Sequence, residues 1–109
     1  MTVSDTAISS DSEQNVIAYS REMGLTHDDF WRLLPRAMGE HTYSVSGNTV
    51  NANIHEGVLE IHIGPPLERK IALLSIPYSE VSFKFTGVTE AQQQAFKSYF
   101  DLRFQRGGG

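Results

Sequence analysis

The sequence contains no cysteine. This absence excludes a disulfide framework, thiolate zinc sites, iron–sulfur clusters and thiol catalysis. No apolar run approaches the ~18 residues that a transmembrane helix needs, and residues 1–20 lack the basic and apolar regions of a signal peptide. We therefore expect a cytoplasmic protein that makes no contact with a membrane.

Local signatures of catalysis are also missing. The chain has no glycine-rich phosphate loop, no nucleophile elbow, no zinc-protease motif and no calcium loop. We expect no cofactor and no metal, and a non-enzymatic role is favoured while an enzymatic one stays open.

Basic residues are few, with 9 Lys and Arg against 13 Asp and Glu and a pI of about 5.4. Because nucleic-acid binding needs many cations to neutralise phosphates, nucleic acid is a disfavoured partner.

What the chain does have is enough apolar sequence for one small core, with 109 residues of which 39% are hydrophobic. Acidic residues gather near the start, with six acids and one base over residues 1–29. Residues 1–12 are rich in Ser, Thr and Asp and can bury too little apolar surface to offset the entropy of ordering. We predict a mobile acidic tail over 1–12 and a single domain over 13–109.

Three segments carry helical signals. Residues 13–23 could form a short helix that ends at Gly24, although its apolar spacing is irregular. A second helix should begin at His27 after a Thr26 cap and end at Gly39, with Pro35 kinking or restarting it. A third should run from the capping box at Thr89 and Gln92 to about residue 105.

Between residues 42 and 86 the apolar residues alternate with polar ones, which is typical of half-buried antiparallel strands. Turns are expected at 47–48, 55–57 and 64–66. The predicted fourth strand, 70–76, is apolar on both faces, so it should be central or lie at a subunit contact. Pro77 should end it or cause a bulge before the fifth strand. The fold class is therefore α+β, a five-strand antiparallel meander with an N-terminal and a C-terminal helix on one face of the sheet.

The last helix suggests an interaction surface. Its apolar residues spread over more than half of the helical circumference, which is more than one sheet can cover. Either the helix that begins at His27 or a second molecule must cover the rest. Because the last helix and the predicted fourth strand both have surplus apolar residues, our leading hypothesis is a protein-binding or assembly module that presents the sheet and the aromatic C-terminal helix to a partner, with self-association as a homodimer the preferred form. The candidate interface residues are Trp31, Phe96, Tyr99, Phe100 and Phe104.

A second hypothesis is a binding protein or enzyme for a small anionic ligand. Arg103 falls inside the apolar arc of the last helix, and a buried guanidinium needs a partner. That partner could be an acidic side chain of the same chain. Alternatively, a cleft could gather arginines for a carboxylate or phosphate ligand. The candidate ligand-binding residues are Arg36, Arg69, Arg103 and Arg106.

The histidines offer a weaker signal for a metal. Glu60 and His62 share one face of the third strand, where His55 or Asn51 could join them. A solvated sheet face explains the same pattern, and we expect that simpler outcome.

The chain ends Arg106-Gly-Gly-Gly109. This resembles the diglycine tail of ubiquitin-like modifiers and sulfur carriers, and the resemblance implies Gly109 as a terminus activated by an adenylating partner. Alternatively, Gly107 ends the last helix in a left-handed conformation and the two following glycines fray.

Overall fold

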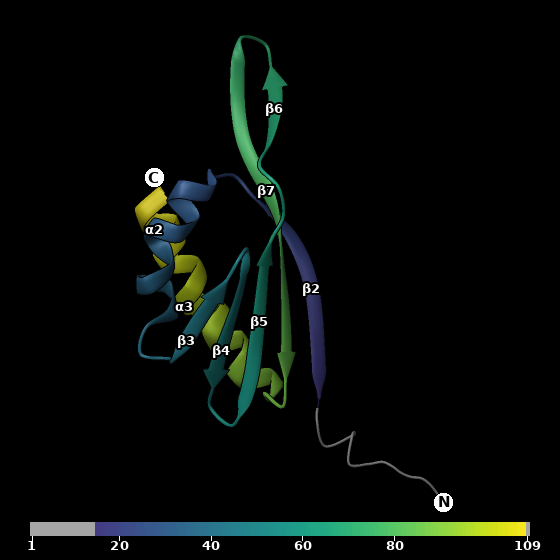
Figure 1. Ribbon diagram of the computed structural model, residues 1–109, viewed down its shortest axis with the longest axis vertical. Helices are drawn as coiled ribbons and strands as arrows, with labels where there is room; N and C mark the ends of the chain where they lie inside the picture. The colour runs from purple at the N-terminus through teal and green to yellow at the C-terminus, as the bar shows by residue number, and fades with distance from the viewer. Residues whose placement is uncertain (1–14, 109) are drawn as a thin grey trace, which may run out of the picture.

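The computed structural model describes residues 15–108, with side chains as far as Gln105, and has the α+β fold predicted from the sequence. The acidic tail over residues 1–12 and the Gly109 terminus lie outside the described residues. In chain order (Figure 1), the elements are β2 (Val16–Met23), α2 (His27–Met38), β3 (Tyr43–Ser46), β4 (Thr49–Ile54), β5 (Gly57–Ile63), β6 (Leu67–Ile71), β7 (Leu74–Thr86) and α3 (Glu90–Gly108).

The sheet is antiparallel throughout, with the order β2-β7-β5-β4-β3 and with β6 paired to β7. Strands β3 to β7 follow one another along the chain, as the predicted meander requires. The predicted helix over 13–23 is wrong, because this segment is β2 and pairs with β7 from Val16↔Thr86 to Met23↔Ser79. Its exposure alternates with a period of two, so its irregular helical spacing was the pattern of a strand.

The prediction for residues 70–76 also needs correction. These residues belong to two strands joined by a turn at Ala72 and Leu73, and β7 then runs for 13 residues through Pro77. Pro77 faces Glu68 of β6 and has no strand on its other side. A proline is tolerated at such a position because its missing N–H points to an open edge.

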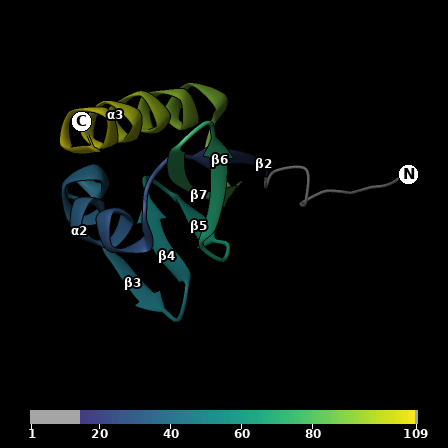
Figure 2. The same cartoon turned by 90° about the horizontal axis from the view of Figure 1, so that it is seen from above.

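Both helices lie on the same side of the sheet (Figure 2). Thr26 caps α2 by accepting a hydrogen bond from the Asp29 N–H at 3.1 Å, and the helix continues through the exposed Pro35. The capping box of α3 forms in both directions, with Gln92 N donating to Thr89 Oγ1 and Thr89 N donating to Gln92 Oε1, each at 3.1 Å. Neither helix is both long enough and apolar enough, within residues 15–108, to cross a membrane.

The core fills the space between the helices and the inner face of the sheet. Its largest fully buried side chains are phenylalanines, contributed by α2, β7 and α3. Phe100 lies edge-on to Phe83 of the sheet, with a centroid distance of 5.3 Å, and Phe104 of α3 lies 5.5 Å from Phe30 of α2. The helices therefore pack on each other as well as on the sheet, and neither of them covers the outer face of the sheet (Figure 2).

Candidate functional site

The outer part of the β6–β7 hairpin projects beyond the rest of the sheet (Figure 1). Strand β2 pairs with β7 only as far as Ser79, and β5 pairs with it only as far as Val81. Among residues 15–108, no other strand lies beside residues 67–78, which form a two-stranded hairpin that we call the arm.

A bulge separates the arm from the body of the sheet. Residues 64–66 lie opposite only residues 79–80, so one strand carries an extra residue. The Ser79 hydroxyl donates a hydrogen bond to the Pro65 carbonyl oxygen at 3.0 Å and fixes this junction. One extra residue shifts the side-chain alternation of that strand by one position. In β5, which precedes the bulge, the odd-numbered residues face the helices. In β6, which follows the bulge, the odd-numbered residues face away from them.

In β7 the apolar residues change face at the same place. Val81, Phe83 and Phe85 are buried beneath the helices. Strict alternation then puts Leu74 and Ile76 on the opposite face, which neither helix covers. The apolar face of the arm, as we call it, consists of Leu67, Ile71, Leu74, Ile76 and Tyr78, with Arg69 among them. The other face is polar and carries Glu68, Lys70, Ser75 and Pro77.

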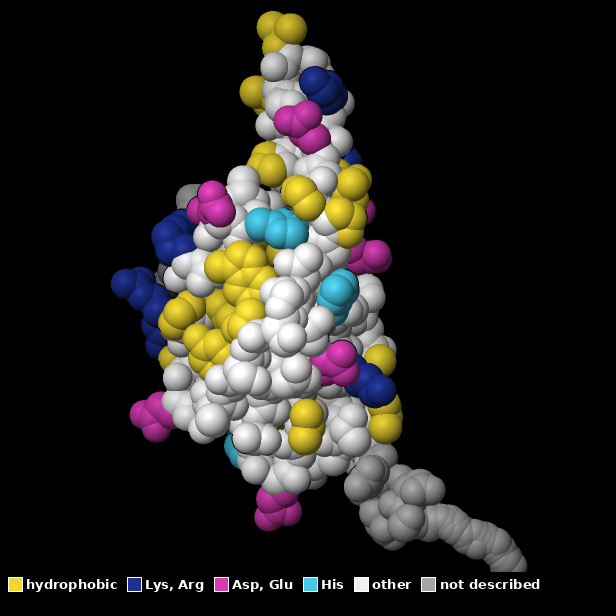
Figure 3. All heavy atoms as spheres, viewed as in Figure 1, with side chains coloured by type: hydrophobic (Ala, Val, Ile, Leu, Met, Phe, Trp, Pro, Cys, Tyr) yellow, Lys and Arg dark blue, Asp and Glu magenta, His cyan; other side chains and the backbone are white. Residues whose placement is uncertain are grey.

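The apolar side chains of the arm are open to solvent. The tip stands clear of the body of the molecule and is hydrophobic (Figure 3). The exposed fractions are 43% for Leu67, 51% for Ile71, 101% for Leu73, 63% for Leu74 and 37% for Ile76. Such a concentration of exposed Leu and Ile on twelve residues is unusual, because exposed apolar side chains are ordinarily scattered singly over a protein surface.

Arg69, one of the predicted ligand-binding residues, lies at the base of this face. Its Nη2 donates to Glu22 Oε1 at 3.1 Å, and its guanidinium lies 4.3 Å from the centre of the Tyr78 ring. The hydrogen bond and the charge of Glu22 raise the pKa of Arg69. Arg69 therefore ties the arm to β2 and is occupied by the chain's own groups.

The other predicted arginines lie elsewhere. Arg36 is exposed on α2, and the guanidinium of Arg103 lies over the Tyr99 ring at 4.6 Å. Neither forms an ion pair with any carboxylate of residues 15–105. Arg69 is across the sheet from both, so the expected single cleft of arginines does not form. The side chain of Arg106 is outside the described part of the chain.

The aromatic residues predicted to form an interface belong mostly to the core. Phe96, Phe100 and Phe104 are 5%, 1% and 6% exposed, so they offer no surface to a partner. Tyr99 is 40% exposed, and Trp31 is half-buried edge-on to Phe30. Of the two alternatives for covering the last helix, packing against α2, the helix that begins at His27, is the one observed. The apolar surplus of the molecule lies on the arm instead.

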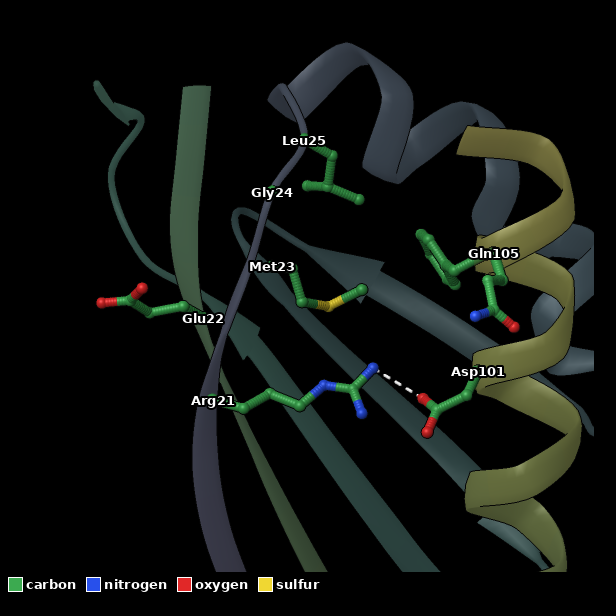
Figure 4. Close-up of a pocket in the computed structure, with 8 residues that line it drawn as sticks. Arg21, Glu22, Met23, Gly24, Leu25, Asp101 and Gln105 are labelled. Atoms are coloured by element: carbon green, nitrogen blue, oxygen red, sulfur yellow. Dashed lines mark ion pairs between the residues drawn. The ribbon is translucent and has the colours of Figure 1, made fainter. Parts of the chain in front are cut away.

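A hollow of about 660 Å³ lies between the end of β2 and the second half of α3 (Figure 4). Arg21 reaches across it from β2, with Nη2 2.6 Å from Asp101 Oδ1. This is a Coulombic contact rather than an aligned hydrogen bond, because Asp101 Oδ1 has no hydrogen-bond partner among the described groups. Asp101 balances the charge of Arg21, so the hollow has little attraction for an anion.

Tyr19 lies on the same side of β2 as Arg21. The pKa of the Tyr19 phenol is raised, mainly because the side chain is partly buried. The nearby Arg21 charge lowers this pKa, and the Asp101 charge raises it. Sequence reasoning assigned residues 13–23 to a helix and so missed β2. The signal for the strand was available, since Ile17, Tyr19, Arg21 and Met23 alternate with more exposed residues, but it does not indicate the contact with Asp101.

The residues proposed for a metal do not gather into a site. His62 lies on the outer sheet face, where its Nδ1 is 3.1 Å from Thr49 Oγ1. Within the described ranges, no group of three or more His, Asp or Glu side chains could hold a metal ion.

Comparison of this chain with protein-family models, with curated proteins and with solved structures finds no match.

Proposed function

We propose that this protein is a non-enzymatic assembly module that binds a second copy of itself through the apolar face of the arm. One observation carries the proposal: the apolar residues of β7 lie on the helix side in the body of the sheet and on the opposite side in the arm. Both helices are on one face (Figure 2), so the chain's described elements cannot cover the arm. The cysteine-free sequence supports a cytoplasmic setting for this role.

Burial of the exposed apolar side chains favours a dimer. The exposed fractions of the four Leu and Ile side chains on this face equal about two complete side chains, which at ~1.5–3 kcal/mol each is worth ~3–6 kcal/mol per arm when buried. Two arms that cover each other would gain about twice that amount. Association costs ~4–15 kcal/mol in lost freedom, so mutual burial of the arms can outweigh it.

Contact between two copies also suits the chemistry of this face. An isologous contact uses the same residues on both sides, so an apolar face is complementary to itself. The only charge within the face, Arg69, is already paired with Glu22 and stacked on Tyr78. Burial would therefore not leave an unpaired charge. Pro77 supplies no N–H along the free edge of β7, which favours packing of faces over the addition of a strand at that edge.

Sedimentation velocity over a range of concentrations tests the proposal. The wild-type chain should sediment as a dimer of 12.2 kDa subunits. Leu74→Asp puts a charge on the apolar face and should shift the protein to monomer. Ser75→Asp puts the same charge on the polar face, one residue away, and should leave the dimer intact.

Two results would count against self-association through this face. A wild-type chain that remains monomeric at the highest concentration would contradict the dimer. A dimer that both variants leave unchanged would show that another surface makes the contact. Both positions are exposed and outside the core, so neither change should unfold the monomer.

A further inference from the structure

The four histidines of the described chain fall into two pairs. His27 Nε2 donates to the Gly64 carbonyl oxygen at 2.7 Å, and His62 contacts Thr49. His41 and His55 have no side-chain hydrogen bond or ion pair with any residue of the described ranges. Their rings nevertheless face each other, with centroids 5.7 Å apart and an interplanar angle of 68°. Two imidazoles with free nitrogens therefore meet at one place.

That place is a cavity of about 330 Å³. It lies where the end of α2, the turn between β4 and β5, and the first half of α3 come together. The buried Met38 and Phe96 give it an apolar floor, and His41 contacts that floor with its ring 5.8 Å from Phe96. Its lining residues are Met38, Gly39, Glu40, His41, His55, Ala95, Phe96 and Tyr99. The volume is within the range of small-molecule sites, which are typically apolar with a few convergent polar groups.

Backbone conformation holds two of the walls in place. His55 has a φ of 55°, a left-handed backbone conformation that residues other than glycine seldom adopt. Gly39 has a φ of 62°, and a Cβ there would lie 3.4 Å from Tyr99 Cε1. The positive φ is what favours glycine at residue 39, since a Cβ at 3.4 Å would make only an ordinary contact with the Tyr99 ring. Tyr99 packs against this end of α2, and Arg103 stacks on the same ring. His55 is the first residue of the two-residue turn between β4 and β5, where a tight hairpin requires a positive φ, so the turn fixes the position of its imidazole at the cavity.

We infer that this cavity binds a small, neutral, planar aromatic molecule with a hydrogen-bonding edge. The Tyr99 ring, which is 40% exposed, provides a surface for stacking. Each neutral imidazole offers one donor and one acceptor, which suits a ring that has both. Glu40 at the rim disfavours an anion. The site is on the helix side of the sheet, so it is independent of the proposed contact through the arm.

Benzimidazole is a suitable probe because its ring carries one N–H donor and one nitrogen acceptor. Indane has a ring system of the same size with no nitrogen, and it is the matched control. In a ¹H–¹⁵N NMR titration, benzimidazole should cause saturable shifts at Gly39, Ala95 and Phe96, and indane should bind at least tenfold more weakly. The side-chain nitrogen signals of His41 and His55 should move with the same midpoint, whereas those of His27 should not.

Variants separate this site from non-specific binding. His41→Ala and His55→Ala should each weaken benzimidazole binding about tenfold, and His62→Ala, on the outer sheet face, should have no effect. Absence of saturable shifts at the cavity would overturn the inference. Equal affinity for indane and benzimidazole, or binding unchanged in both cavity variants, would also overturn it, because the imidazoles would then contribute nothing.

Discussion

Asp29 stabilises the first turn of α2 in two ways. Its N–H donates to Thr26 Oγ1, and its carboxylate accepts a hydrogen bond from Arg32 Nη2 at 2.9 Å. The hydrogen bond from Arg32 lowers the pKa of Asp29 below its ordinary value of 3.8, and the Thr26 hydroxyl contributes in the same direction. The ionised form is thus the one that the folded state favours.

This shift predicts a pH dependence of stability. A carboxyl whose pKa is lower in the folded state contributes stability above its ordinary value, and the contribution is lost as the pH falls through the folded pKa. Asp29→Asn should therefore lower the melting temperature near neutral pH, and the two proteins should converge as the pH falls below the ordinary Asp value of about 4 and through the lower folded pKa. Thermal unfolding followed by circular dichroism measures this. A difference that stays constant over the acid range would contradict the role of the Asp29 charge.

Capping residues could be predicted from the sequence because they act within one turn of their own helix. Thr26 and Gly39 bound α2, and Thr89 and Gln92 open α3, as predicted. The Arg21–Asp101 pair joins residues eighty positions apart and depends on where β2 and α3 meet. No local pattern indicates that meeting point, so the pair could not be predicted.

At the scale of elements, the Arg21–Asp101 contact connects β2, an edge strand, to α3. The two side chains are 28% and 39% exposed, so the pair is only partly screened by water. In a double-mutant cycle with Arg21→Met and Asp101→Asn, we expect a coupling free energy of about 1 kcal/mol.

The Lys70–Glu68 pair of the arm provides the control. Its charged groups are 3.9 Å apart, and the side chains are 76% and 54% exposed. The same cycle at this pair should give a coupling near zero, because exposed ion pairs contribute little. Urea unfolding of each variant supplies the free energies. Equal coupling at the two pairs would show that the partial burial of Arg21 and Asp101 has no energetic consequence.

The β6–β7 hairpin also explains why residues 70–76 look apolar on both faces of a strand. The turn at Ala72 and Leu73 reverses the chain, so Ile71 and Leu74 lie on the same face although their numbers differ in parity. Sequence patterning identified this segment as central or as a subunit contact. It could not find the turn, because Ala72 adopts a φ of 56° without the glycine or asparagine that marks such positions.

At the scale of the whole molecule, two helices cover one face of an antiparallel sheet, and the arm turns its apolar residues to the other face. The class of fold, the capped helices and most strands could be predicted because apolar periodicity reports which side of each element is buried. The apolar character of residues 70–76 was visible in the sequence, but their place on a projecting arm could not be predicted, because it depends on the turn at Ala72 and Leu73. The aromatic residues of α3 are mostly buried instead of exposed, because α2 and α3 share the core.

The central claim is that two copies pack the apolar faces of their arms together. The natural chain has no cysteine, so a single introduced cysteine reports its own surroundings. Ile76→Cys labels the apolar face and Ser75→Cys labels the polar face of the same strand. Treated with a short bis-maleimide, Ile76→Cys should give a covalent dimer in high yield and Ser75→Cys should give little. Equal yields from the two positions, or no dimer from Ile76→Cys, would contradict the claim.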